Sequence, residues 1–324
     1  MKIFPAEYCV RRAMEDGHVG PNTIITETSS GTMAYGLAIV SVLRNLALTI
    51  VTDPACDKRM VGKLNGLGAH VEVVSKPALV GGYQRARLDR LHEILAENPH
   101  SWWVNQYDNP ANSAAYAPVA AQILDQYGPV DILVGTVGSG GSMCGLSAYL
   151  RQVCPALHVV GVDTFNSVLF GQPDGKRVLR GLGNSLVPGN LDHTTFDDIH
   201  WVSAAEAFTA TRVLYRETTL FQGPTSGASW LVAKWYAKRH PDARVVCLFP
   251  DGGERYLDSV YDDLYLSEHT LRIDQLPSEP VHLTSPMDVS HRWSKMEWGR
   301  RTLTDVNSIE AGQIDEAIFS ARRK

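Results

Sequence analysis

Residues 134–142 read Val-Gly-Thr-Val-Gly-Ser-Gly-Gly-Ser, and this stretch indicates how the chain folds. It follows an apolar run typical of a buried strand and leads into a helical pattern at residues 141–153. Glycines let backbone N–H groups approach an anion closely, and a helix N-terminus adds a favourable partial charge. The stretch is neither a dinucleotide fingerprint nor a Walker loop. It predicts a phosphate bound at the start of a helix; the alternative is a tight turn without a ligand.

Outward from this loop, short apolar runs alternate with longer helical patterns. We expect strands at residues 23–26, 48–52, 71–74, 102–105, 131–135, 158–163 and 244–249. We expect helices at residues 58–67, 83–97, 115–126 and 141–153. This alternation predicts an α/β fold with parallel strands covered by helices on both faces. Ligands bind such sheets at the carboxyl ends of the strands, where this chain has loops rich in Gly, Ser and Asn.

Composition excludes several classes of protein. The chain has 324 residues, enough for about two domains, and a formal net charge of −5, which argues against a nucleic-acid or membrane-surface partner. Its five cysteines form no C-x-x-C pair, so neither a metal site nor a disulfide framework is expected. The N-terminus lacks a signal-peptide pattern, and no apolar run reaches the ~18 residues of a membrane span. We therefore expect a cytoplasmic protein.

Five more glycine-rich or polar segments occur along the chain, two before the loop at 134–142 and three after it. They are Glu-Thr-Ser-Ser-Gly-Thr-Met at 27–33, Asn-Gln-Tyr-Asp-Asn-Pro-Ala-Asn at 105–112, Gly-Leu-Gly at 181–183 with Val-Pro at 187–188, Gly-Pro-Thr-Ser-Gly-Ala at 223–228, and Pro-Asp-Gly-Gly-Glu-Arg-Tyr-Leu at 250–257. Together with the loop at 134–142, they resemble six motifs of the cysteine synthase family of fold-type II pyridoxal-phosphate (PLP) enzymes. The resemblance runs in register from Lys2 to about Tyr265 and does not cover the rest of the chain.

The resemblance implies a tryptophan synthase β-like fold, with two open parallel-sheet α/β domains and PLP between them. We expect a smaller N-terminal domain at about 30–120, a PLP-binding domain from 1–29 and 121–265, and a C-terminal extension at 266–324. That extension should be partly helical near its end, with Trp293 and Trp298 exposed or docked. Members of the family carry several tens of residues before the PLP lysine, so N-terminal strands of the sheet are expected to be missing here.

The family's Schiff-base lysine lies in S-x-K-D-R, before a helix and the substrate loop. Counting back from Glu27 places Lys2 there. The alternative for Lys2 is a frayed terminal lysine. The pyridine nitrogen would meet the hydroxyl of Thr225, which would leave it unprotonated and favour β-elimination over transamination. Thr32 stands where the family has an asparagine on the ring hydroxyl. The residues expected to hold the phosphate are Gly138, Ser139, Gly140, Gly141 and Ser142.

The resemblance also implies a substrate site. The substrate carboxylate would meet Ser29, Ser30, Gly31 and Gln106. Arg180 stands where enzymes that use O-acetylserine usually have glutamine. A guanidinium suits a phosphate leaving group, so O-phosphoserine is favoured, and O-acetylserine remains possible. The alternative for Arg180 is a solvated loop arginine.

The expected activity is a transferase reaction of the cysteine synthase type, β-replacement on O-activated L-serine through an aminoacrylate. Sulfide or thiosulfate would give cysteine or S-sulfocysteine. Residues 81–83, 103–107 and 256–261 also resemble siderophore diaminopropionate-precursor synthases, so an amine nucleophile is an alternative. Two others are a catalytically inactive regulatory paralogue and a lyase or dehydratase of the same fold; the segment at 105–112 and Arg180 disfavour the last. The expected partners are an amino-acid substrate, a nucleophile and a second copy of the chain in a homodimer.

Overall fold

The computed structural model describes residues 1–324 except 80, 289 and 308–324. The chain divides into two compact units. Unit 1 comprises Met1–Gln122, Ser139–Leu146 and Pro188–Asn190, and unit 2 comprises Ile123–Gly138, Ser147–Val187 and the described residues from Leu191 onward. Both units are built on a sheet with helices, which confirms the predicted α/β class. The functional domain boundaries expected above stay a prediction.

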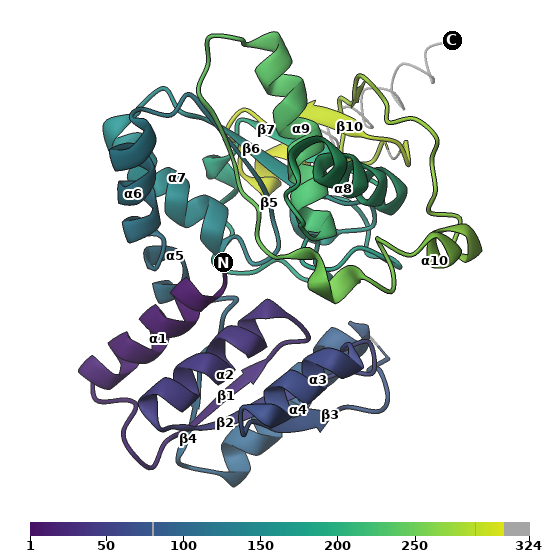
Figure 1. Ribbon diagram of the computed structural model, residues 1–324. Helices are drawn as coiled ribbons and strands as arrows, with labels where there is room; N and C mark the ends of the chain where they lie inside the picture. Colours follow the sequence, from purple (N-terminus) through teal and green to yellow (C-terminus); the bar gives the residue numbers. More distant parts are fainter. Residues whose placement is uncertain (80, 289, 308–324) are drawn as a thin grey trace, which may run out of the picture. The chain divides into compact units, whose positions relative to one another are not determined.

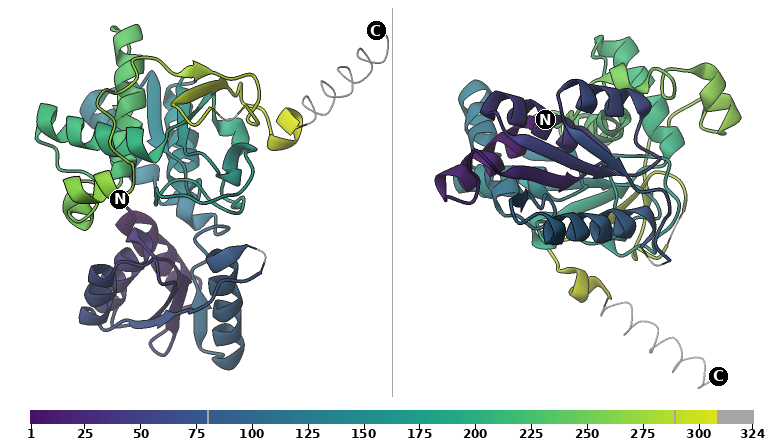
Figure 2. Two further views of the ribbon diagram at one scale, coloured as in Figure 1. Left: turned by 90° about the vertical axis from the view of Figure 1, so that its right-hand side faces the viewer. Right: turned by 90° about the horizontal axis from the view of Figure 1, so that it is seen from below.

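Unit 1 contains a four-stranded parallel sheet in the order β3-β2-β1-β4. Helices α2 and α3 pack on one face, and Figure 2 (left) shows α4 on the other. The strands are β1 (Ile24–Thr28), β2 (Ala47–Thr52), β3 (His70–Val73) and β4 (Ser101–Trp103). The helices up to the end of this part of the chain are α1 (Ile3–Glu15), α2 (Thr32–Arg44), α3 (Lys58–Gly66), α4 (Gly82–Glu97), α5 (Ala111–Ala114) and α6 (Ala117–Tyr127).

The N-terminal helix α1 is amphipathic. Its buried residues Ala6, Cys9, Val10 and Ala13 recur at helical spacing and pack against α2. Helix α2 is itself rich in small and aliphatic residues and lies between α1 and the sheet. This packing fixes the start of α1, where Lys2 lies.

Unit 2 contains a six-stranded sheet in the order β8-β5-β6-β7-β10-β9. The strands are β5 (Ile132–Thr136), β6 (His158–Asp163), β7 (Asp198–Trp201), β8 (Val245–Cys247), β9 (Val281–His282) and β10 (Ser294–Glu297). The helices are α8 (Ala204–Thr218), α9 (Pro224–Arg239) and α10 (Asp263–Glu268), with 3-10 turns at Val168–Phe170, His193–Thr195 and Gly253–Tyr256. Helix α7 (Gly141–Val153) begins in the part of the chain assigned to unit 1 and ends in unit 2.

Helices α8 and α9 lie side by side in unit 2 (Figure 1), and α9 packs on β5, β6 and β8. A capping box starts α8: Ser203 and Glu206 satisfy each other's backbone amides. Pro224 occupies the first turn of α9, where its missing N–H costs nothing. The core beneath them combines aliphatic residues, among them the fully buried Val134, Val160 and Val232, with the aromatic Trp235 and Trp293. Among the described residues, no helix is both long and apolar enough to span a bilayer.

All seven expected strands are present to within two residues. Strand β7 was not expected, nor were β9 and β10, which lie in the C-terminal extension. Strand β10 runs antiparallel to β7 and widens the sheet of unit 2. Trp293 and Trp298 are 1% and 0% exposed, so they dock rather than face solvent. The extension was expected to be partly helical near its end, and residues 303–307, the last described ones, are helical; residues 308–324 lie outside the described part of the chain.

Candidate active site

Lys2 lies at the start of α1 with its amine directed at Ser139 of the predicted phosphate-binding loop, residues 138–142, called here the cup loop. Its Nζ donates a hydrogen bond to Ser139 Oγ at 3.3 Å. Burial lowers the pKa of Lys2 to about 8, while the nearby Cys9 and Glu27 act in the opposite direction. An amine with this pKa is partly neutral near pH 7, which is what a nucleophilic lysine requires. Lys2 is therefore chemically suited to its predicted Schiff-base role, which stays a prediction.

The backbone of Lys2 is held against α2. A Cβ atom at Gly36 would lie 3.0 Å from the Lys2 carbonyl oxygen, so a glycine permits this close approach. The same oxygen accepts a hydrogen bond from Ala6 N at 3.2 Å. Lys2 is therefore not frayed in this structure, because its backbone is part of the α1–α2 contact.

Ser139 belongs to a hydrogen-bonded chain within unit 1. Asn112 Nδ2 lies 3.5 Å from Ser139 Oγ and 2.6 Å from the Gln106 carbonyl oxygen. Gly140 has a φ of +81°, and α7 begins at Gly141. Amide groups in a first helical turn lack intrahelical acceptors and are available to an anion. The structure thus brings Lys2 to Ser139, and Asn112 to both Ser139 and Gly141.

The predicted substrate loop forms a second helix start in unit 1. Strand β1 ends at Thr28, and Ser29 N donates to Val51 O at 3.2 Å. Gly31 N donates to Ser29 Oγ at 3.2 Å, and α2 begins at Thr32. The loop therefore presents the amide end of α2, which suits a carboxylate.

Glu27 anchors this loop, a role that the sequence analysis did not assign. Its fully buried carboxylate accepts hydrogen bonds from Thr28 N at 2.7 Å, Gln106 N at 3.0 Å and Trp103 Nε1 at 3.3 Å. Burial raises the pKa of Glu27 to about 7, and these hydrogen bonds oppose the shift. Gln106 Nε2 donates to Thr28 O at 3.0 Å, so its side chain is tied to β1.

Unit 2 brings together three other predicted residues or motifs. A Cβ atom at Gly138 would lie 3.3 Å from the Gly181 carbonyl oxygen, and one at Gly181 would lie 3.0 Å from Thr225 Cγ2. Gly181 also has a φ of +88°, where a side chain is strained. Thr225 lies in the first turn of α9 and is 2% exposed.

Thr225 has a carboxylate neighbour that the sequence analysis did not identify. Its Oγ1 donates to Asp251 Oδ1 at 3.2 Å, and Tyr256 OH donates to Asp251 Oδ2 at 2.6 Å. Burial raises the pKa of Tyr256; the carboxylate of Asp251 adds to the shift, and the charge of Arg180 opposes it. Arg180 is exposed, and within the described ranges no carboxylate forms an ion pair with it.

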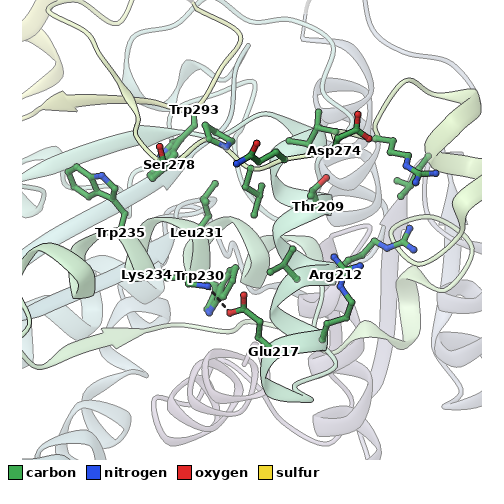
Figure 3. Close-up of a pocket in the computed structure, with 18 of the residues that line it drawn as sticks. Thr209, Arg212, Glu217, Trp230, Leu231, Lys234, Trp235, Asp274, Ser278 and Trp293 are labelled. Carbon is green, nitrogen blue, oxygen red and sulfur yellow. Dashed lines mark hydrogen bonds and ion pairs between the residues drawn. The ribbon is translucent and has the colours of Figure 1, made fainter.

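Unit 2 also contains a cavity lined by residues outside the predicted PLP and substrate sites. It has a volume of about 590 Å³ and lies among α8, α9, α10 and the start of the C-terminal extension (Figure 3). Two ion pairs lie along it, Lys234 with Glu217 and Arg212 with Asp263, both at 2.6 Å. None of the residues predicted to hold PLP or the substrate lines this cavity. It is therefore not part of the candidate active site.

The donor set suits PLP. Lys2 offers an amine of lowered pKa, and the cup loop offers helix-start amides with a hydroxyl at Ser139. Within unit 1, Asn112 Oδ1 is buried beside Gly141 and has no hydrogen-bond partner among the described residues. Buried polar atoms are rarely left unpaired without a functional reason.

Comparisons with known proteins point to the same cofactor. Residues 1–251 match the family model described as "Pyridoxal-phosphate dependent enzyme". Two N-(2-amino-2-carboxyethyl)-L-glutamate synthases are each 38% identical to this chain. The one from Cupriavidus metallidurans aligns over 84% of this chain and 82% of its own length, and the one from Ralstonia nicotianae over 82% and 80%.

The fold is similar to that of solved structures. The O-acetylserine dependent cystathionine β-synthase of Helicobacter pylori has a TM-score of 0.75 at 27% identity, over 80% of this chain and 84% of that one. The family match covers most of the chain and includes both Lys2 and the cup loop. This chain belongs to the pyridoxal-phosphate-dependent enzyme family, and PLP is its cofactor.

Proposed function

We propose that this enzyme catalyses β-replacement on an O-activated L-serine, with the amine of an amino acid as the nucleophile. The observation that carries the proposal is the 38% identity, over more than four fifths of the chain, to two N-(2-amino-2-carboxyethyl)-L-glutamate synthases. The sulfur nucleophile expected from the sequence is not confirmed. The relatives favour the amine alternative, with glutamate as the first candidate.

The name of these relatives defines the bond that is formed. A 2-amino-2-carboxyethyl group is the skeleton of serine without its hydroxyl, attached in the product to the nitrogen of glutamate. The serine derivative therefore loses its β-substituent with the bonding electron pair. A C–N bond forms at the same carbon, and the amine releases one proton.

The residues of this chain are suited to such a reaction. PLP, when bound, supplies electron withdrawal at the substrate Cα. Lys2, with a pKa of about 8, can hold and return a proton at Nζ. The loop at residues 29–31 offers amides and hydroxyls to the substrate carboxylate, and Thr225 is the expected contact of the ring nitrogen. Arg180 would bind a phosphate leaving group, because its guanidinium has no carboxylate partner in the described structure.

The test is a matrix of substrates. The holoenzyme is incubated with O-phosphoserine or O-acetylserine, and with glutamate, sulfide or thiosulfate as the nucleophile, and products are identified by mass spectrometry. We expect a glutamate adduct of the 2-amino-2-carboxyethyl group, with phosphate release from O-phosphoserine. Turnover only with sulfide or thiosulfate would contradict the proposal and return the enzyme to cysteine or S-sulfocysteine formation.

A further inference from the structure

Asp251 lies beside Thr225 in a fixed position. Thr225 Oγ1 donates to Asp251 Oδ1 at 3.2 Å, and the Asp251 side chain is only 11% exposed. A Cβ atom at Gly223 would lie 2.5 Å from the same Oδ1, so the carboxylate occupies the space that a side chain at residue 223 would need. Gly223 N also donates to the Asp251 carbonyl oxygen at 3.0 Å. The carboxylate is thereby held against the first turn of α9.

Several groups around Asp251 favour its anionic form. Tyr256 OH donates to Oδ2 at 2.6 Å, and Arg255 Nη1 lies 3.9 Å from the same oxygen. The N-terminus of α9 adds positive partial charge. Burial nevertheless raises the pKa of Asp251 above its usual range, and these contacts offset burial only in part. A further positive charge near this carboxylate would therefore be stabilised.

The hydroxyl of Thr225 has a single proton to donate. Once that proton is directed at Asp251, the oxygen has only lone pairs to offer a second partner. The second partner must then be a donor.

We propose that Asp251 makes Thr225 a hydrogen-bond acceptor toward the ring nitrogen of PLP, so that the bound cofactor carries a proton on that nitrogen. The proton comes from solvent, and no other bond changes. This inference rests on the proposed contact between Thr225 and the ring nitrogen. It reverses the expectation that a neutral hydroxyl leaves the nitrogen unprotonated, because that expectation took no account of Asp251. Asp251 acts here through Thr225 and is a positioning residue.

The experiment measures the protonation state of the ring nitrogen directly. The holoenzyme is prepared with PLP labelled with ¹⁵N in the ring, and its ¹⁵N chemical shift, which distinguishes N–H from bare nitrogen, is recorded at neutral pH without substrate. We expect an N–H signal in the wild type and in the exposed control Asp258→Asn, and bare nitrogen in Asp251→Asn. A wild type with bare nitrogen, or an Asp251→Asn protein with an unchanged N–H signal, overturns the proposal.

A second variant covers the case in which Asp251→Asn does not fold or does not retain PLP. Thr225→Val keeps the carboxylate and removes the hydroxyl that connects it to the ring, so it should also lose the N–H signal. An unchanged N–H signal in Thr225→Val overturns the proposal as well. The measurement is made on bound PLP alone. A failure to form the glutamate adduct would therefore contradict the proposed function without altering this result.

Discussion

Asn112 occupies the space that a side chain on Gly141 would need. A Cβ atom at residue 141 would lie 2.7 Å from Asn112 Oδ1 and 2.9 Å from Nδ2. Asn112 cannot move aside freely, because its Nδ2 donates to the Gln106 carbonyl oxygen at 2.6 Å. The first residue of α7 is therefore glycine for a steric reason, and the cup loop is coupled to the segment that carries Gln106.

This relationship predicts the effect of Gly141→Ala. The added methyl group should displace Asn112 or the cup loop, at a cost of about 1–3 kcal/mol typical of overpacking. We expect PLP affinity to fall by about ten- to a hundredfold, measured by fluorescence titration of the apoenzyme. The double variant Asn112→Ala/Gly141→Ala should recover part of that loss, because the clash is gone. The control is Gly62→Ala, where a Cβ atom meets nothing within 4 Å; equal losses in both single variants would exclude the steric explanation.

Borohydride reduction should identify the PLP lysine. With a pKa of about 8, the amine of Lys2 is the candidate nucleophile for the cofactor aldehyde. After reduction and digestion, we expect the pyridoxyl group on the Lys2 peptide. A Lys2→Arg variant should bind PLP without forming a reducible link. Labelling of Lys58, Lys63 or Lys76 instead would show that the register of the N-terminal motif is wrong.

Arg180 should govern the choice of leaving group. A phosphate monoester carries close to two negative charges at neutral pH, whereas an acetyl ester carries none. Charge-assisted hydrogen bonds to a guanidinium contribute about 1.5–3 kcal/mol, so Arg180→Ala should lower kcat/KM for O-phosphoserine by about ten- to a hundredfold. O-Acetylserine should be nearly unaffected. Arg180→Lys keeps the charge but not the planar fork. Its kcat/KM for O-phosphoserine should lie between those of the wild type and Arg180→Ala. Equal losses with both substrates would rule out a leaving-group contact.

The loop and helix around residues 134–153 could be predicted from the sequence because their signals are local. An apolar run, glycines and a helical pattern follow one another, and α7 has the bounds expected for it. Strand β7 could not be predicted in this way, since its sequence Asp-Ile-His-Trp mixes charged and apolar residues. Asp198 is buried there because His158 lies 2.8 Å away and Lys295 3.0 Å away. Lys295 comes from β10, almost a hundred residues later in the chain.

The candidate site could be predicted only in part from the sequence. Lys2 and Ser139 came from a resemblance in sequence, and the structure places them in contact. Glu27, Asn112 and Asp251 lay within the same motifs but received no role. Their importance comes from burial and from partners on other elements, which the spacing of one motif does not reveal.

Glu27 should make stability depend on pH. Its pKa is raised from 4.5 to about 7 in the folded protein. Between these values the unfolded chain releases the proton while the folded protein keeps it, so the free energy of unfolding should fall as pH rises through this window. Above about pH 7 the loss is complete, on the order of 3 kcal/mol. Glu27→Gln cannot ionise and should lack this decline. The free energy of unfolding is measured with urea from pH 4 to 8 for the wild type and for Glu27→Gln. The wild-type value minus the variant value should fall as pH rises, and a difference that rises with pH would contradict the prediction.

Trp293 should show that the C-terminal extension is part of the fold of unit 2. The side chain is 1% exposed, and its Nε1 donates to His200 Nδ1 at 3.0 Å, while its backbone N donates to Glu206 Oε1 at 2.7 Å. Burial lowers the pKa of His200 to about 3, so the imidazole stays neutral and can accept this bond at ordinary pH. Trp293→Ala should leave a cavity and an unpaired Nδ1 on His200, at a cost of about 3–5 kcal/mol in the free energy of unfolding. Met287→Ala, at an exposed position of the same extension, is the matched control and should change stability by less than about 0.5 kcal/mol. If both variants unfold at the same urea concentration as the wild type, the extension does not contribute to the core of unit 2.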